Sequence, residues 1–243
     1  MGCEKSHSIF LAFYKVRDVM LLVAAPPAPA PGVKDCNPAA ANISPPMALR
    51  IGLTGGIGAG KSEVARILGE LGAYIIDTDE LAREAVAPNS DGLLAIAHTW
   101  PQFVRGGALD RAALAEVVFS DPQALARLNE IVHPFVRRLA KERETYAKPD
   151  QLIVHVVPLL FESGYIDMVD KSVVVIAPLE QRIERVVERD HIDPAQILAR
   201  MKTQIDPEEA RARADYVIEN DGDLTHLRGQ TRTVYDALTG IAH

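Results

Sequence analysis

The stretch from residue 55 to residue 62 constrains the fold of this chain more than any other feature. Its sequence, GGIGAGKS, matches the pattern G-x-x-x-x-G-K-[ST]. A short apolar run at residues 49–54 precedes it and predicts a strand. The apolar residues that follow recur at the spacing of one helix face and are Val64, Ile67, Leu68 and Leu71. A strand, a glycine-rich turn and a helix in this order predict a phosphate-binding loop, and a chance match is the alternative.

The residue types of this phosphate loop, residues 55–62, each have a physical reason. Glycines let the backbone turn until its N–H groups point at phosphate oxygens, and the next helix adds the partial positive charge of its N-terminus. We expect Lys61 to reach the β- and γ-phosphates of a nucleotide and the Ser62 hydroxyl to bind Mg²⁺. The residues expected to contact the nucleotide are Gly55, Gly56, Ile57, Gly58, Ala59, Gly60, Lys61 and Ser62.

Composition narrows the class of protein. A chain of 243 residues with 48% hydrophobic residues can form one large α/β domain or two small ones. A net charge of −7 argues against binding nucleic acid through a basic surface. Both cysteines, Cys3 and Cys36, precede residue 47, which leaves none for a disulfide, a metal site or a thiol nucleophile in the rest of the chain. We expect a folded cytoplasmic enzyme without a nucleic-acid partner.

The first 46 residues differ from the rest. Seven of the 16 prolines lie there, which favours an extended, disordered segment. Its two apolar runs, residues 9–14 and 19–25, are separated by charged residues, and neither has the roughly 20 residues of a membrane span. The opening MGCEKS matches a myristoylation pattern, so lipidation of Gly2 is one alternative. The other is that Met47 is the natural start and that residues 1–46 are an appendage.

From residue 47 onward, apolar runs alternate with amphipathic segments, which predicts a parallel sheet with helices on both faces. We expect helices at residues 81–87, 112–118 and 125–140, between the second and third strands. Because this region is longer than a crossover needs, residues 80–145 are expected to form the acceptor-substrate site. The charged segment 185–213 has the character of a helical lid. The five strands are expected at residues 49–54, 73–76, 152–157, 172–176 and 216–218.

Two aspartates, Asp77 and Asp79, directly follow the second predicted strand. Ligands of open α/β sheets bind at the carboxyl ends of the strands, and phosphoryl transfer to a hydroxyl needs a carboxylate that takes the proton. One of the pair is therefore a candidate base, while helix capping by Asp77 or Thr78 is the alternative for one of them. Arg83 lies one helical turn after Asp79, so the two share a face and are expected to line the acceptor pocket.

Arginines recur on one face of a predicted helix at Arg182, Arg185 and Arg189. Such a stripe suits a polyphosphate, although a surface face paired with acids elsewhere is the alternative. The third strand lacks the aspartate that commonly holds Mg²⁺, so the metal is expected on Ser62, phosphates and water, with Asp77 or Glu162 behind them. His133 precedes Pro134 and predicts a helix break. It is not given a catalytic role, and we group it with the acceptor-binding residues.

Six blocks of this sequence, in order, resemble those of dephospho-coenzyme A kinases. The resemblance runs from residue 47 to the end of the last strand. It implies transfer of the γ-phosphoryl of ATP, with Mg²⁺, to the ribose 3′-hydroxyl of dephospho-CoA, the last step of coenzyme A biosynthesis. The blocks are IGLTGGIGAGKS at 51–62, IDTD with LAR at 76–83, HP at 133–134, VVPLLFE at 156–162, ERD at 188–190 and ADYVIEN at 214–220.

The resemblance also implies roles for residues. Asp79 would be the base, Arg185 and Arg189 the lid arginines, and Asn220 a contact of the nucleotide base. The implied fold is a P-loop core like that of nucleoside monophosphate kinases, with a five-stranded parallel sheet, a helical acceptor domain and a helical lid. Ala59 departs from the serine that is frequent at its position. The alternatives are another P-loop nucleoside or nucleotide kinase, a P-loop ATPase or switch protein, and a nucleotide-binding module.

Overall fold

The structure is a computed structural model, and it describes residues 14–16, 19–21, 48–202 and 204–240. The disorder and lipidation predictions for residues 1–46 thus fall almost wholly outside the described residues. Within that segment, two short strands, β1 (Tyr14–Val16) and β2 (Val19–Leu21), pair antiparallel.

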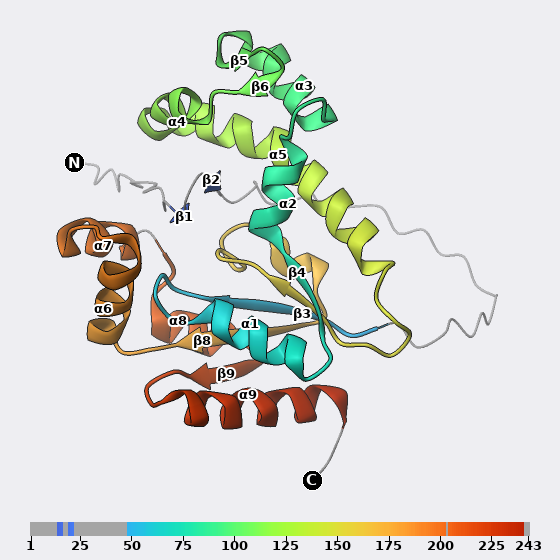
Figure 1. Cartoon of the computed structure of the whole chain (residues 1–243), viewed down its shortest axis with the longest axis vertical. Coiled ribbons are helices and arrows are strands. Elements are labelled where there is room, and N and C mark those ends of the chain that lie inside the picture. The colour runs from blue at the N-terminus through green and yellow to red at the C-terminus, as the bar shows by residue number, and fades with distance from the viewer. Residues whose placement is uncertain (1–13, 17–18, 22–47, 203, 241–243) are drawn as a thin grey trace, which may run out of the picture.

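A five-stranded parallel sheet forms the centre of the molecule, as predicted (Figure 1). The strands lie in the order β4-β7-β3-β8-β9. The first strand of the sheet, β3, is therefore its middle strand, and the phosphate loop leaves the sheet at its centre. The strands are β3 (Arg50–Gly55), β4 (Tyr74–Asp77), β7 (Ile153–Val156), β8 (Lys171–Ile176) and β9 (Tyr216–Glu219).

Alternate residues of the central strand face opposite sides of the sheet. On β3, Ile51 and Leu53 are fully buried in the cluster that includes α1 (Lys61–Glu70) and α9 (Leu224–Thr239). Gly52 faces the other side, where a Cβ atom would lie 2.8 Å from Leu160 Cδ2. The strand is buried from residue 51 to residue 55 because helices cover both of its faces.

The opposite cluster joins the sheet to other helices. Helices α2 (Thr78–Ala85), α5 (Pro122–Glu144) and α8 (Pro207–Arg213) contribute buried residues to it, as do α3 (Asp91–Thr99) and α4 (Arg111–Ser120). In Figure 1, α9 lies below the strands, while α2 and α5 rise above them. The sheet is thus the middle of three layers, and its carboxyl edge remains open for a site.

Residues 78–144 form a helical lobe above the sheet, which we call the helical insertion (Figure 1). The three helices predicted there are present. The helix break at Pro134 was a wrong interpretation, because α5, which is 23 residues long, continues through this proline. Packing of α5 against α2, α3 and α4 holds the helix together across the lost hydrogen bond. The further elements are α3 (Asp91–Thr99), η1 (Pro101–Phe103), β5 (Val104–Arg105), β6 (Ala108–Leu109) and α4 (Arg111–Ser120).

Two helices beside the phosphate loop, α6 (Leu179–Asp190) and α7 (Pro194–Met201), pack on each other and are called the lid below. Helix α8, which also falls in the predicted lid segment, contacts β8. The remaining element is η2 (Tyr165–Met168). Among the described residues, no helix has both the length and the apolarity that a membrane crossing requires.

Candidate active site

The phosphate loop adopts a backbone that its glycines make possible. Gly58 and Gly60 have φ angles of 75° and 100°, in the left-handed region that disfavours other residues. A Cβ atom at Gly58 would lie 2.4 Å from the Arg182 carbonyl oxygen, and one at Gly60 would lie 2.2 Å from Asn220 Nδ2. Conformation and close packing therefore both require glycine at these two positions.

Lys61 begins α1, and its side chain folds back over the loop. Its Nζ donates a hydrogen bond to the Gly55 carbonyl oxygen at 2.8 Å, and only 8% of the residue is exposed. Ser62 follows in the first turn of α1 and is exposed. The helix N-terminus, the ammonium group and the hydroxyl group thus face one region, as a phosphate with a bound cation requires.

The two aspartates after β4 have different environments. Asp77 caps α2, because its Oδ1 accepts hydrogen bonds from the backbone N–H of Asp79 at 2.8 Å and of Glu80 at 3.4 Å. The capping alternative is therefore confirmed for Asp77. Asp79 Oδ1 is buried and has no hydrogen-bond partner among the described residues. A carboxylate oxygen left in this state is available to a ligand.

The electrostatic environment of Asp79 suits proton transfer. Burial, and secondly the charge of Asp77, raise the pKa of Asp79 to about 6, while Lys61 and Arg83 act in the opposite direction. A carboxyl group with a pKa near the working pH is mostly ionised but still basic enough to accept a proton.

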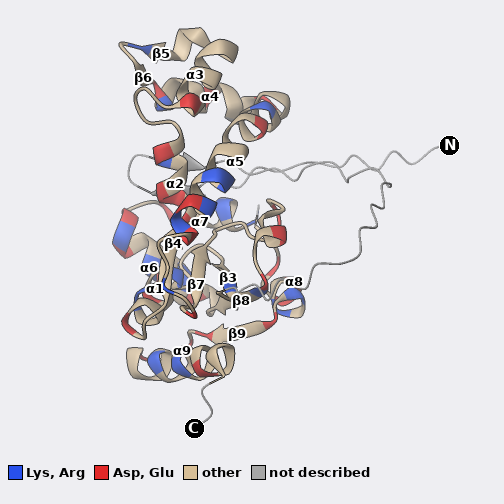
Figure 2. Ribbon diagram, turned by 90° about the vertical axis from the view of Figure 1, so that its right-hand side faces the viewer, with Lys and Arg blue, Asp and Glu red and all other residues tan. Residues whose placement is uncertain are grey.

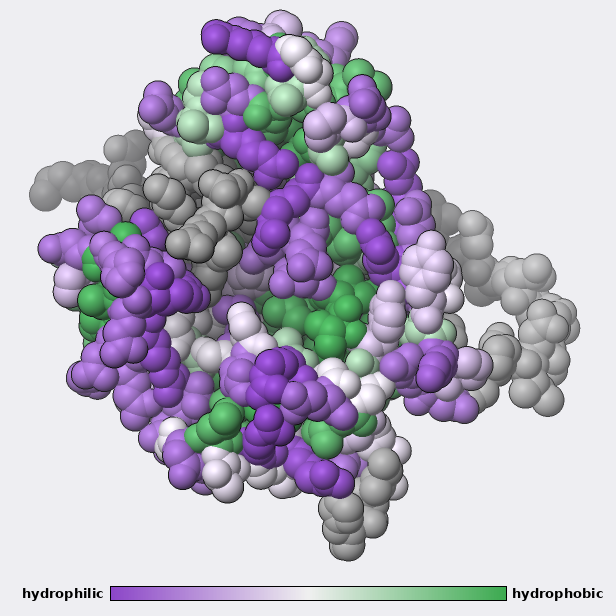
Figure 3. All heavy atoms as spheres, in the orientation of Figure 1, coloured by the Kyte–Doolittle hydropathy of each residue, from purple (hydrophilic) through white to green (hydrophobic). Residues whose placement is uncertain are grey.

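One large cavity of about 960 Å³ joins the phosphate loop, α2 and the lid. In Figure 3, the visible surface of the lid is mostly hydrophilic. Most of the predicted site residues with polar side chains line this cavity, namely Lys61, Ser62, Asp77, Asp79, Arg83, Arg185 and Arg189.

Several predicted residues do not line the large cavity. His133 lines a separate cavity of about 30 Å³, which shares only Pro158 with the large one. Asn220 follows β9, and its Nδ2 donates to the Ala59 carbonyl oxygen at 2.8 Å, so it braces the phosphate loop. Glu162 accepts a hydrogen bond from the backbone N–H of Ile205 at 3.1 Å.

The arginines of α6 do not act as one uniform stripe. Arg182 is buried, and its Nε donates to the Ile57 carbonyl oxygen at 2.9 Å, so it supports the loop from behind. Arg185 donates to the Gly58 carbonyl oxygen at 3.4 Å, while Arg189 pairs with Asp190 at 2.7 Å. Figure 2 shows both signs of charge around α6 and α7. Of the three arginines, only Arg185 and Arg189 line the large cavity.

Ile57 connects the loop to both ends of the lid. Its carbonyl oxygen accepts from Arg182 of α6, and its N–H donates to Gln204 Oε1, just after α7, at 2.9 Å. The Ile57 side chain is buried with Val186 and Ile197 in a small cluster within the lid. The phosphate loop and the lid are therefore joined by two hydrogen bonds and a shared apolar cluster.

Sequence reasoning missed several residues of the site. Gln204 lies outside any charge pattern or motif, and its contact with Ile57 spans 147 positions, so no local signal indicates it. Arg66 and Arg200 also line the cavity. On α1, Arg66 pairs with Glu63 at 2.5 Å, which in sequence is the pattern of an ordinary solvated helix face.

The polar side chains of this site fit a metal ion that is also held by substrate phosphates and water. Among the described residues, no cluster of three or more histidine, cysteine or acidic side chains exists that could enclose a metal. Mg²⁺ is commonly held by one or two protein oxygens together with substrate phosphates and water. The Ser62 hydroxyl and the Asp77 carboxyl group on the cavity wall are donors of the kind that such binding uses.

Comparison with known proteins decides the family. A family model described as dephospho-CoA kinase matches residues 49–226. The chain belongs to the dephospho-CoA kinase family. A dephospho-CoA kinase of Streptomyces avermitilis is 44% identical over 197 residues, which cover 80% of this chain and 96% of the relative. One of Deinococcus radiodurans is 46% identical over 189 residues, which cover 77% and 91%.

Solved structures agree with the family and the fold. The crystal structure of TT1252 from Thermus thermophilus superposes with a TM-score of 0.71 and 39% identity, and the match covers 81% of this chain and 99% of that one. Dephospho-CoA kinase from Campylobacter jejuni superposes with a TM-score of 0.60 and 27% identity, covering 79% and 98%. The predicted P-loop α/β fold is confirmed.

Proposed function

We propose that this dephospho-CoA kinase family member transfers the γ-phosphoryl of ATP to the ribose 3′-hydroxyl of dephospho-CoA, giving coenzyme A and ADP in the last step of coenzyme A biosynthesis. The observation that carries the proposal is the buried, unpartnered Asp79 Oδ1 on the wall of the cavity that also contains Lys61 and the phosphate loop. A base and a phosphate cradle on one cavity are the two parts that phosphoryl transfer to a hydroxyl needs.

The donor side of the reaction is assigned to the phosphate loop. The loop N–H groups and the N-terminus of α1 would bind the ATP phosphates, and Lys61 would place its charge on the β- and γ-phosphates. Arg185 and Arg189 line the cavity from the lid and would neutralise charge on the transferred group. Ser62 and phosphate oxygens would hold Mg²⁺, which, when bound, supplies positive charge that offsets the charge of the transferred phosphoryl group.

On the acceptor side, Asp79 takes the proton. The 3′-oxygen forms a bond to the γ-phosphorus, the bond from that phosphorus to the β–γ bridging oxygen breaks, and the hydroxyl proton passes to the Asp79 carboxylate. The bond electrons leave with ADP. We assign Arg83 to the acceptor pocket because it shares the cavity wall with Asp79. His133 stays a weaker assignment, since its cavity is a separate one.

We further propose that residues 47–243 form the kinase unit, with the acceptor at residues 80–145 and a lid at 185–213. The partners are the small molecules ATP and dephospho-CoA, with no nucleic acid and no membrane partner, and the location is cytoplasmic. The absence of cysteine after residue 36 and the net charge of −7 support these last proposals.

The variant Asp79→Asn tests the base assignment. It removes the proton acceptor without changing the size of the side chain, so turnover is expected to fall by about two orders of magnitude or more. Binding of ATP with Mg²⁺, measured by calorimetry, is expected to change little, because the phosphate loop is untouched. Turnover equal to that of the unchanged protein would rule out Asp79 as the base.

A further inference from the structure

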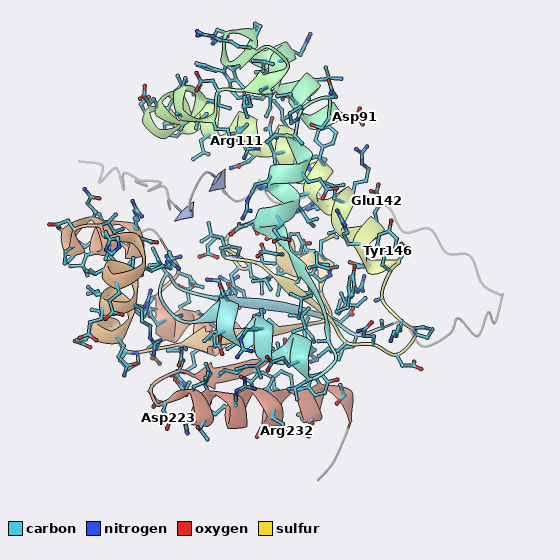
Figure 4. All side chains as sticks on the ribbon, in the orientation of Figure 1. Asp91, Arg111, Glu142, Tyr146, Asp223 and Arg232 are labelled. Carbon is cyan, nitrogen blue, oxygen red and sulfur yellow. The ribbon has the colours of Figure 1, made fainter. Side chains whose placement is uncertain are left out.

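A second positively charged group lies behind Arg83 in the helical insertion. Arg83 stands on α2 and lines the large cavity, and its Nε is buried without a hydrogen-bond partner among the described residues. Arg111, the first residue of α4, donates from Nη2 to the backbone carbonyl oxygen of Arg83 at 3.4 Å. Figure 4 shows Arg111 on the underside of α4, in the upper half of the insertion.

Among the described residues, acidic side chains compensate this pair of arginines only in part, through the charge interaction of Arg83 with Asp79. Within the part of the chain that the structure describes, neither guanidinium forms an ion pair with an acidic side chain. The neighbouring Asp110 uses its Oδ1 to cap α4, where it accepts from the Ala113 N–H at 3.1 Å. Burial, and secondly the charge of Arg83, lower the pKa of Arg111. Two like charges that are partly buried and form no ion pair among the described residues favour an anion that binds between or beside them.

The distance between Arg83 and the candidate base, Asp79, indicates which anion binds there. Arg83 follows Asp79 by four residues on α2, so their Cβ atoms are about 5–6 Å apart on one face of the helix. A ribose whose 3′-hydroxyl lies at Asp79 carries its 5′ substituent on the other side of the same small ring. Asp79 and Arg83 line the same cavity, so a 5′ substituent that extends from such a ribose toward Arg83 stays within that cavity.

We propose that Arg83 and Arg111 together bind the 5′-linked diphosphate of the acceptor, and that they thereby select nucleotides with a diphosphate over unphosphorylated nucleosides. This inference rests on the proposed function. Guanidinium groups suit the task, because their planar set of N–H donors matches phosphate oxygens two at a time. The acceptor would thus be held at two points, at the hydroxyl by Asp79 and at the diphosphate by the arginines.

The variant Arg111→Gln tests the inference, because glutamine keeps an N–H donor for the Arg83 carbonyl group but removes the charge. We expect kcat/KM for dephospho-CoA to fall about 10- to 100-fold, the usual effect of losing a hydrogen bond to a charged group, mainly through KM. We expect kcat/KM for adenosine to stay within about twofold, since adenosine has no diphosphate. Arg111→Lys, which keeps the charge, is expected to recover part of the loss.

Two further measurements make the test decisive. Binding of dephospho-CoA is measured by calorimetry with the phosphate loop saturated by a non-hydrolysable ATP analogue and Mg²⁺, which gives an answer even if adenosine reacts too slowly. The matched control is Arg105→Gln, because Arg105 is an exposed arginine of the same insertion, on β5. It is expected to leave both acceptors unaffected.

The outcomes separate this inference from the proposed function. Equal losses with dephospho-CoA and adenosine, or unchanged binding of dephospho-CoA, would overturn the diphosphate site and leave the kinase reaction standing. An unmodified protein that does not phosphorylate dephospho-CoA would overturn the proposed function, and the diphosphate site with it. Selective loss with dephospho-CoA, together with an unchanged Arg105→Gln control, supports the site.

Discussion

The proposed base makes the folded protein less stable, and the size of that effect follows from its environment. The pKa of Asp79 rises from its ordinary value of 3.8 to about 6, mainly through burial. A difference of about two pH units, at about 1.36 kcal/mol for each, corresponds to about 3 kcal/mol. Asp79→Asn removes the charge, so this variant is expected to be more stable than the unchanged protein at neutral pH while losing most of its turnover.

The pH dependence of this gain has a definite sign. Below about pH 3.8 the carboxyl group is protonated in the folded and unfolded states alike, and it has no destabilising effect. As the pH rises toward 6, the unfolded state has released the proton while the folded state still holds it, so folding becomes less favourable. The pH-dependent part of the advantage of Asp79→Asn should therefore grow from about 1 kcal/mol at pH 4.5 to about 3 kcal/mol at pH 8.

Urea unfolding of both proteins between pH 4.5 and pH 8, with EDTA and without nucleotide, measures this difference directly. The quantity compared is the change with pH of the stability difference between the two proteins, because a constant effect of the amide group does not vary with pH. Asp167→Asn is a suitable control, because Asp167 is exposed on η2, and its curve should follow that of the unchanged protein. A stability difference between Asp79→Asn and the unchanged protein that does not vary with pH would refute the reasoning.

Two other predictions follow from the same site. With saturating ATP and Mg²⁺, kcat/KM for dephospho-CoA should fall about tenfold per pH unit below about pH 6, as Asp79 becomes protonated, and a profile that stays flat to pH 5 would contradict the assignment. Gln204→Met removes the acceptor of the Ile57 N–H and should weaken ADP binding, measured by calorimetry, about 3- to 10-fold. Gln204→Glu keeps an acceptor oxygen and should weaken ADP binding less. Equal effects of both variants would show that this hydrogen bond does not matter.

The parts of the site that the sequence predicted correctly are local in the chain. Lys61 and Ser62 belong to one loop between a strand and a helix, and Asp79 follows the next strand at once. Their positions at the carboxyl edge follow from the parallel topology alone. Residue type and position alone could not separate the roles of Asp77 and Asp79, because both lie at the carboxyl end of the same strand and only the hydrogen bonds of the α2 N-terminus distinguish them.

The parts that the sequence did not predict depend on contacts between distant segments. Arg182 was placed in a basic stripe for a polyphosphate, but the fold buries it behind Ile57, 125 positions away. Pro134 was interpreted as a helix break, but packing of α5 on its neighbours keeps the helix continuous. In both cases tertiary packing overrides a correct local tendency.

The most direct test of the central claim is a coupled ADP-release assay with ATP and Mg²⁺, in which dephospho-CoA, AMP, adenosine and no acceptor are compared and the product is analysed for the position of the new phosphate. The account predicts ADP release that depends on dephospho-CoA and yields a 3′-phosphorylated product. ADP release without any acceptor, or a clear preference for AMP or adenosine, would contradict it.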